Sequence, residues 1–188
     1  MKVITAPEMY VKQPGDVFVF LAGGITKCAD WQSEVIKNLG NSFINKFDQN
    51  DHLIVFNPRR KDFDITDPDA SIKQIEWEFN ALENCDIFSM FFCESESVQP
   101  ICMYELGRNI ARMQMRFPKN WDDRLVITME KGYSRRNDVE VQCRLAIGYD
   151  LICTYANYGN AIINHAKEIA DVYRKRRHLD AFSYFNEK

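Results

Sequence analysis

The sequence lacks the features that mark membrane, secreted and nucleic-acid-binding proteins. No apolar run approaches the ~18 residues of a membrane-spanning helix, and residues 1–7 have no apolar core of the kind found in signal peptides. Neither sign of charge is in large excess, since 24 Lys and Arg are balanced by 27 Asp and Glu and the net charge is −3. Such a balance predicts no attraction to polymeric nucleic acid or to anionic membranes. We therefore expect a cytoplasmic protein with no membrane partner.

Metal and cofactor signatures are absent as well. The three histidines, His52, His165 and His178, stand far apart, and the six cysteines include no Cys-x-x-Cys pair, so we expect no metal. Several cysteines lie in or beside apolar runs, which is typical of reduced, buried residues, and we expect all six to be reduced. Neither Gly-x-Gly-x-x-Gly nor Gly-x-x-x-x-Gly-Lys-Ser/Thr is present, so we expect no dinucleotide or triphosphate cradle and no cofactor.

What the chain does have is an alternation of apolar runs and helical patterns. Its 188 residues, 46% hydrophobic and 27% charged, suit a single globular domain spanning residues 1–188. The strands are expected at 17–21, 53–56, 86–92, 125–129 and 151–154, and the helices at about 30–39, 71–84, 100–113, 139–146 and 161–177. This order predicts a three-layer α/β fold with a five-stranded parallel sheet in flavodoxin-like order.

The stretch from residue 87 to residue 107 organises the chain. A fully apolar strand is followed by a polar loop and by Pro100, which suits the first position of a helix. Glu105 then lies in the opening turns of that helix, near the carboxyl end of the strand, where open α/β sheets bind ligands. We expect the helix dipole to keep Glu105 ionised. Glu105 either only complements that dipole or acts as a nucleophile.

A second carboxylate lies on the helix expected before this strand. Glu78 has the helical spacing of the apolar residues Ile72, Ile75, Phe79 and Leu82, so we expect it on the buried face. Burial raises the pKa of a carboxyl group, which predicts a Glu78 that holds or accepts a proton near neutral pH. The alternative is a side chain that tilts to solvent or pairs with an arginine.

Two loops at other strand ends supply further candidates. Gly23 and Gly24 let the backbone turn sharply and approach a ligand after the first expected strand. Asp30 suits a helix N-cap, and Trp31 either anchors the core or stacks on a flat base.

The other loop follows the second expected strand. There Asn57, Arg59 and Arg60 are candidates to hold a phosphate or carboxylate. The alternative for the two arginines is pairing with the acidic residues of segment 61–69. We expect that segment to form a mobile flap over the site.

Six motifs in order give the chain a resemblance to a known family. They are Phe20-Leu21-Ala22-Gly23-Gly24-Ile25, Asp30-Trp31-Gln32, Asn57-Pro58-Arg59-Arg60, Gln74-Ile75-Glu76-Trp77-Glu78, Pro100 to Gly107, and Gly132 to Val139. Over residues 17–150 the chain resembles the nucleoside 2-deoxyribosyltransferase-like family. The resemblance implies that Glu105 is the nucleophile and that Glu78 assists in the site. It also implies a homo-oligomer, at least a dimer, in which a neighbouring subunit completes the pocket, and the segment 133–138, with Arg136, is the candidate to reach across.

One position departs from the pattern of the wider superfamily. Its better-studied members have an aspartate and a Gly-rich turn before the nucleophile helix, where this chain has Val98-Gln99-Pro100. We therefore expect Gln99 to contact the substrate and to affect which sugar is preferred.

Carboxylate chemistry is the mechanism that these residues predict best. Two carboxylates can cleave a glycosidic bond by double displacement, and the resemblance implies an N-glycosidic bond of a nucleoside or nucleotide with transfer of the deoxyribosyl group to another base. Two alternatives stay open, namely hydrolysis of a nucleoside 5′-monophosphate and nucleotide binding without turnover.

Overall fold

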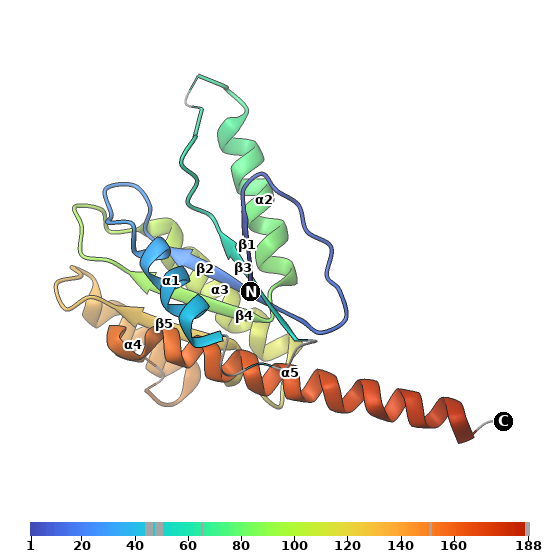
Figure 1. Cartoon of the computed structure of the whole chain (residues 1–188). Helices are drawn as coiled ribbons and strands as arrows, with labels where there is room; N and C mark the ends of the chain where they lie inside the picture. The colour runs from blue at the N-terminus through green and yellow to red at the C-terminus, as the bar shows by residue number, and fades with distance from the viewer. Residues whose placement is uncertain (44–46, 48–50, 65, 151, 187–188) are drawn as a thin grey trace.

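The chain forms a parallel β-sheet covered by helices on both faces (Figure 1). This computed structural model describes residues 1–43, 47, 51–64, 66–150 and 152–186. The strands are β1 (Lys2–Thr5), β2 (Asp16–Gly23), β3 (His52–Asn57), β4 (Ile87–Phe92) and β5 (Leu125–Met129). The helices are α1 (Trp31–Phe43), α2 (Ala70–Asn84), α3 (Pro100–Arg116), α4 (Arg136–Ile147) and α5 (Tyr155–Asn186), with a short 3₁₀ helix at Asp122–Arg124.

The order of the strands places a crevice at the centre of the sheet. The order is β1-β3-β2-β4-β5, and every pair is parallel. Apart from the edge strand β1, this is the start of the flavodoxin-like order, which confirms the expected fold class. After β2 the chain moves to β3 on one side and then to β4 on the other. The carboxyl ends of β2 and β4 therefore form the topological switch point, where such sheets bind ligands.

The set of five strands differs from the expected set at both ends of the chain. Residues 2–5, which we did not expect to be a strand, form β1 and pair with residues 54–57 of β3. The strand expected at 151–154 is wrong, because Ile152 makes only an isolated bridge to Ile127 before α5 begins at Tyr155, while residue 151 lies outside the described residues. A four-residue edge strand is too short for its alternation to stand out.

Each face of the sheet has its own apolar layer. On one face α2, α3 and α4 contribute to a core around Phe20, Phe88 and Leu106. On the other face α1 and α5 pack Trp31 and other side chains against Phe91. Strands β2 and β4 are buried along nearly their whole length, as expected for central strands covered on both sides.

The buried face of α2 is not the one that its spacing predicted. Ile72, Ile75 and Phe79 are 56%, 63% and 50% exposed. The buried side chains are Ala70, Trp77, Ala81 and Leu82. Trp77 contacts both Phe20 and Phe56, so burying the largest ring fixes the rotation of the helix. Figure 1 also shows the first turns of α2 extending beyond the sheet, where no core is available to cover them.

Two cysteines are not reduced as expected. Cys28, in the loop after β2, and Cys93, directly after β4, form a disulfide although 65 positions separate them in the sequence. The fold brings them together because β2 and β4 are neighbours with their carboxyl ends side by side. Cys85, Cys102, Cys143 and Cys153 are free. Among the described residues, no helix is both long and apolar enough to cross a membrane.

Candidate active site

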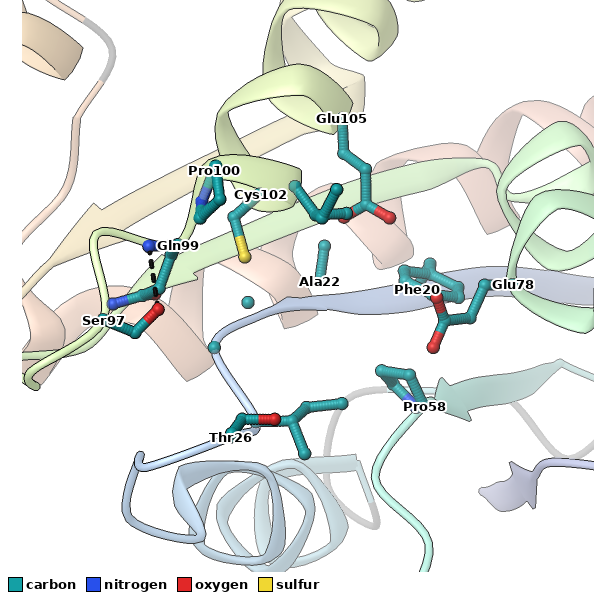
Figure 2. A pocket seen from close by; sticks show the side chains of 14 residues that line it. Phe20, Ala22, Thr26, Pro58, Glu78, Ser97, Gln99, Pro100, Cys102 and Glu105 are labelled. Carbon is teal, nitrogen blue, oxygen red and sulfur yellow. Dashed lines mark hydrogen bonds between the residues drawn. The ribbon is translucent and has the colours of Figure 1, made fainter. Parts of the chain in front are cut away.

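A cavity of about 220 Å³ lies at the switch point between β2 and β4 (Figure 2). One wall is the end of β2 with the loop that follows it, residues 22–26, and Pro58. The opposite wall is the segment before α3 and the first turns of that helix. Glu105 of α3 and Glu78 of α2 both line the cavity, so the structure brings the two predicted carboxylates together from separate helices.

The Glu105 side chain is held by the packing of α3. Leu106 and Ile110 of this helix are buried against the sheet, which turns Glu105 towards the cavity (Figure 2). Burial raises the pKa of the Glu105 carboxyl to about 7, the negative charge of Glu78 adds to the rise, and Arg108 opposes it. The helix dipole was expected to keep Glu105 ionised, but with this raised pKa the carboxyl group is only partly ionised near neutral pH. Glu105 is the sixth residue of a helix that begins at Pro100, beyond the first turn in which the dipole acts strongly.

Glu78 projects into the same cavity from α2. Burial raises the pKa of its carboxyl group, and a hydrogen bond that Gln74 donates to Glu78 Oε1 over 2.8 Å partly offsets this. Gln74 Nε2 also donates to the carbonyl of Pro58, at 2.9 Å, and so fixes the amide between the helix and the loop after β3. In the described part of the chain, the polar partner of Glu78 is thus an amide and not an arginine.

The two glycines shape the first wall. Gly23 has a φ of +152°, and a Cβ built there would lie 2.6 Å from the Trp31 ring, so only glycine fits. Trp31 itself is 3% exposed, packs on Phe91, and donates from Nε1 to the carbonyl of Gly24 over 2.9 Å. Of the two roles considered for Trp31, the structure places it in the core beneath the loop and outside the cavity lining.

The arginines after β3 do not line this cavity. Arg59 Nε donates to Gln32, and its Nη2 atom donates to carbonyls of the β2–α1 loop, most closely to Ala29 O at 2.9 Å. Asn57 Oδ1 accepts the Arg59 backbone N–H, and Arg60 stacks on Phe63. Asn57, Arg59 and Arg60 line a separate cavity of about 600 Å³ at the ends of β1 and β3. The described residues of segment 61–69 do not line the Glu105 cavity either.

Gln99 lies directly before α3 and lines the Glu105 cavity. Its backbone is left-handed, with a φ of 51°, and its Nε2 atom donates to the carbonyl of Cys93 over 2.7 Å. Within the described residues its Oε1 atom is buried and accepts no hydrogen bond. A buried acceptor without a donor is unfavourable, so Gln99 has an unused hydrogen-bonding site in the cavity wall.

The segment expected to reach a neighbouring subunit is partly buried. Tyr133 is 3% exposed, stacks on Phe92, and donates its hydroxyl to the carbonyl of Val98 over 2.9 Å. Arg136 pairs with Glu140 at 2.7 Å and lines another cavity, of about 670 Å³, at the end of β5. Tyr133 therefore supports the loop before α3 of its own chain, and Arg136 lies outside the Glu105 cavity.

Thr26, Ser97 and Cys102 are among the cavity residues that sequence reasoning did not predict. Cys102 stands three positions before Glu105 on the same helix, so helical spacing was a signal that could have found it. Thr26 and Ser97 belong to loops, where no periodicity indicates direction.

One group of side chains has the composition of a metal site. Asp123, His165 and Glu168 each place a ligand atom within 4.8 Å of the others, near the amino end of β5 and away from the cavity. Glu168 is exposed, and such groups are common without a metal.

Comparison with known proteins shows the family to which the chain belongs. Residues 16–117 match the family model described as nucleoside 2-deoxyribosyltransferase like. The match covers more than half of the chain and includes both carboxylates, and the protein belongs to this family. No curated protein matches the sequence.

Proposed function

We propose that the protein cleaves the N-glycosidic bond of a 2′-deoxynucleoside or nucleotide and transfers the deoxyribosyl group to another base. The observation that carries this proposal is the pair of carboxylates, Glu78 and Glu105, that faces one cavity at the switch point of the sheet. Two acids in a partly apolar cavity suit a sugar that develops positive charge as its base departs. A site that only binds a neutral nucleoside has no need of such a pair.

The pKa of Glu105 bears on which carboxyl group acts as the nucleophile and which assists proton transfer. With a pKa of about 7, roughly half of the Glu105 side chains are ionised at neutral pH. The ionised carboxylate attacks C1′, forming a C1′–O bond as the C1′–N bond breaks, and Glu78 or a water that it holds delivers a proton to the departing base. A second base then attacks C1′, releases Glu105, and gives up its proton to the same group.

The family also suggests a homo-oligomer in which a second copy completes the cavity. We propose at least a dimer. Since Tyr133 is buried in its own chain, residues 134–138 are the part of the expected segment that remains available for such a contact.

Product analysis tests the proposed reaction. The protein is incubated with purine and pyrimidine 2′-deoxynucleosides and their 5′-monophosphates, with and without a second free base, and the products are separated by chromatography. A new nucleoside that contains the second base is the expected result. Free sugar alone would identify a hydrolase instead. No product from any substrate contradicts catalysis at this site.

Labelling tests the role of Glu105. A 2′-fluoro nucleoside analogue slows breakdown of the covalent intermediate, so wild-type protein should gain the mass of the sugar on Glu105. Glu105→Gln should gain none and should lose several orders of magnitude in turnover. Glu76→Gln, an exposed residue of α2, is the matched control and should behave as wild type. A label on Glu78 would show that Glu78, and not Glu105, is the nucleophile.

A further inference from the structure

The disulfide between Cys28 and Cys93 joins the two walls of the cavity. Cys28 belongs to the loop after β2, whose residues 23–26 form one wall. Cys93 begins the segment that leads through Ser97 and Gln99 into α3, which forms the other wall. The disulfide is thus a covalent link across the seam between the walls.

Gly24 connects the disulfide to the shape of the cavity. A Cβ built on Gly24 would lie 2.8 Å from Cys93 Sγ and 2.7 Å from Gln99 Oε1, and closer still to Cys28 Sγ. The backbone of Gly24 is therefore packed directly against both sulfur atoms while it lines the cavity. Thiol sulfurs that are not bonded to each other need van der Waals separation, well beyond the ~2.05 Å of a disulfide. Breaking the bond must therefore move the wall at Gly24.

The other contacts of the loop decide which way it moves. Arg59 holds the loop carbonyls to the end of β3, and Trp31 Nε1 holds the Gly24 carbonyl to α1. Across the seam, beside the disulfide, the exposed pair between Lys27 and Glu96 spans 2.8 Å. An exposed ion pair contributes little to stability. Once the disulfide is broken, the loop stays attached to β3 and α1 and separates from the α3 side.

We propose that the Cys28–Cys93 disulfide is a redox-sensitive latch. The disulfide holds the cavity closed, and its reduction by a low-molecular-weight thiol opens the cavity. Cys93 is 2% exposed, whereas Cys28 is half-buried between the exposed residues Lys27 and Ala29. A thiolate of the glutathione class therefore attacks Cys28 Sγ, forms a mixed disulfide there and releases Cys93 as a thiolate that takes up a proton.

A second thiol completes the reduction. It attacks the sulfur of the first reagent molecule, releases Cys28, and leaves as the oxidised reagent. The net change breaks one protein disulfide, forms one reagent disulfide and leaves two protein thiols. Oxidised glutathione reverses the sequence.

Tryptic cleavage after Lys27 measures opening of the loop without reference to any activity. The intact chain is equilibrated with reduced or with oxidised glutathione, treated briefly with trypsin, and the Lys27–Cys28 cleavage is followed by mass spectrometry. We expect cleavage to be at least several-fold faster in the reduced protein. Cys28→Ser and Cys93→Ser should cleave at the fast rate under both conditions. Cys153→Ser, which removes a partly buried free cysteine, should respond as wild type.

Substrate kinetics supply a second readout, which does rest on the proposed function. Reduction should raise KM more than it lowers kcat, because Glu105 and Glu78 belong to helices that the latch does not move. Cys102→Ser should keep this response, which separates the latch from the cavity thiol. Equal cleavage at Lys27 in both states, or no Cys28–Cys93 peptide after treatment with oxidised glutathione, overturns the proposal even if the protein is an active transferase.

Discussion

Glu105 illustrates how burial and neighbouring charge set the chemistry of a single residue. The sequence predicted its position at a strand's carboxyl end, because a strand, a loop and a proline-led helix have clear local signatures. It did not predict the raised pKa of the carboxyl group. That depends on how deeply the side chain is buried and on the charge of Glu78, and both follow from the packing of α2 beside α3.

The raised pKa of Glu105 predicts the pH dependence of the reaction. The nucleophile must be ionised, so kcat/KM should rise as the pH increases through an apparent pKa of about 7. Replacing Glu78 with Gln removes a neighbouring negative charge, and the rising limb should move to lower pH while kcat falls. Rate measurements from pH 5 to pH 9 test both statements. A rising limb that stays in place in the variant would exclude coupling between the two acids.

The raised pKa of Glu105 also makes the stability of the folded protein depend on pH. The unfolded chain releases the Glu105 proton near its ordinary pKa of 4.5, whereas the folded protein keeps it until about pH 7. Stability therefore falls as the pH rises through this interval. Glu105→Gln should be more stable than wild type at pH 8 by roughly 1–3 kcal/mol, and the difference should vanish near pH 4. Urea unfolding at the two pH values measures it, and an equal difference at both contradicts the assignment.

Arg59 is a residue whose role the sequence left open. Neighbouring arginines after a proline suit a phosphate site, yet the Arg59 guanidinium donates to loop carbonyls from Gly24 to Ala29. These acceptors come from a distant part of the chain, so local sequence gave no sign of them.

Arg59→Ala should therefore loosen the β2–α1 loop and cost about 2–3 kcal/mol of stability. Nucleoside and nucleotide turnover should fall by the same factor, as steady-state kinetics on both will show. Lys61→Ala, at an exposed neighbouring position, should change neither. A loss confined to nucleotides would instead assign Arg59 to phosphate binding.

At the scale of elements, complete burial was easier to predict than partial burial. The central strands are apolar at nearly every position and were found within one or two residues of their observed bounds. The rotation of α2 about its axis could not be predicted from the sequence, because both faces of the helix carry apolar residues. Only the fit of Trp77 against β2 and β3 decides which face is buried. The disulfide was missed for a related reason, since strand order and not sequence distance brings Cys28 to Cys93.

Asp86, directly before β4, joins several elements at the amino end of the sheet. Its carboxylate is 1% exposed and accepts hydrogen bonds from Phe18 N at 2.8 Å, Lys12 Nζ at 2.6 Å and the Tyr173 hydroxyl at 2.7 Å. A buried carboxylate with this many donors stabilises the fold. Its removal leaves the buried guanidinium of Arg124, whose Nη1 lies 3.9 Å from Asp86 Oδ1, without its carboxylate partner.

Asp86→Ala should therefore lower the free energy of unfolding by about 3–5 kcal/mol. Turnover of the folded fraction should be unchanged, because the cavity lies at the opposite end of the strands. Asp69→Ala is the matched control, since Asp69 at the start of α2 makes no side-chain capping bond, and should cost less than about 1 kcal/mol. Urea titration measures both, and a small loss at Asp86 would show that the cluster is dispensable.

For the whole molecule, the order of the elements was predictable because helices and strands alternate and parallel strands require such crossovers. The position of the cavity followed from that order, since the switch point lies where β2 and β4 meet. The surface of the assembled molecule was not predictable in this way. Which apolar side chains remain outside depends on how far each helix extends past the sheet.

The two helices that supply the carboxylates also carry exposed apolar residues. Ile72, Ile75 and Phe79 lie on α2, and Ile101 and Tyr104, at 65% and 68% exposed, lie on α3, each helix also carrying one of the two carboxylates. Several exposed apolar side chains on neighbouring helices are typical of a surface that a partner covers. In line with the homo-oligomer proposed above, we take that partner to be a second copy of the chain.

Light scattering coupled to gel filtration should therefore find at least a dimer at micromolar concentration. Ile75→Glu places a charge within the apolar surface and should shift the protein to a monomer without unfolding it. If a second copy completes the cavity, turnover should fall together with the dimer fraction and recover at higher protein concentration. Leu145→Glu, at a 74% exposed position on α4, should leave the assembly intact. A fully active wild-type monomer would show that each chain builds its whole site alone.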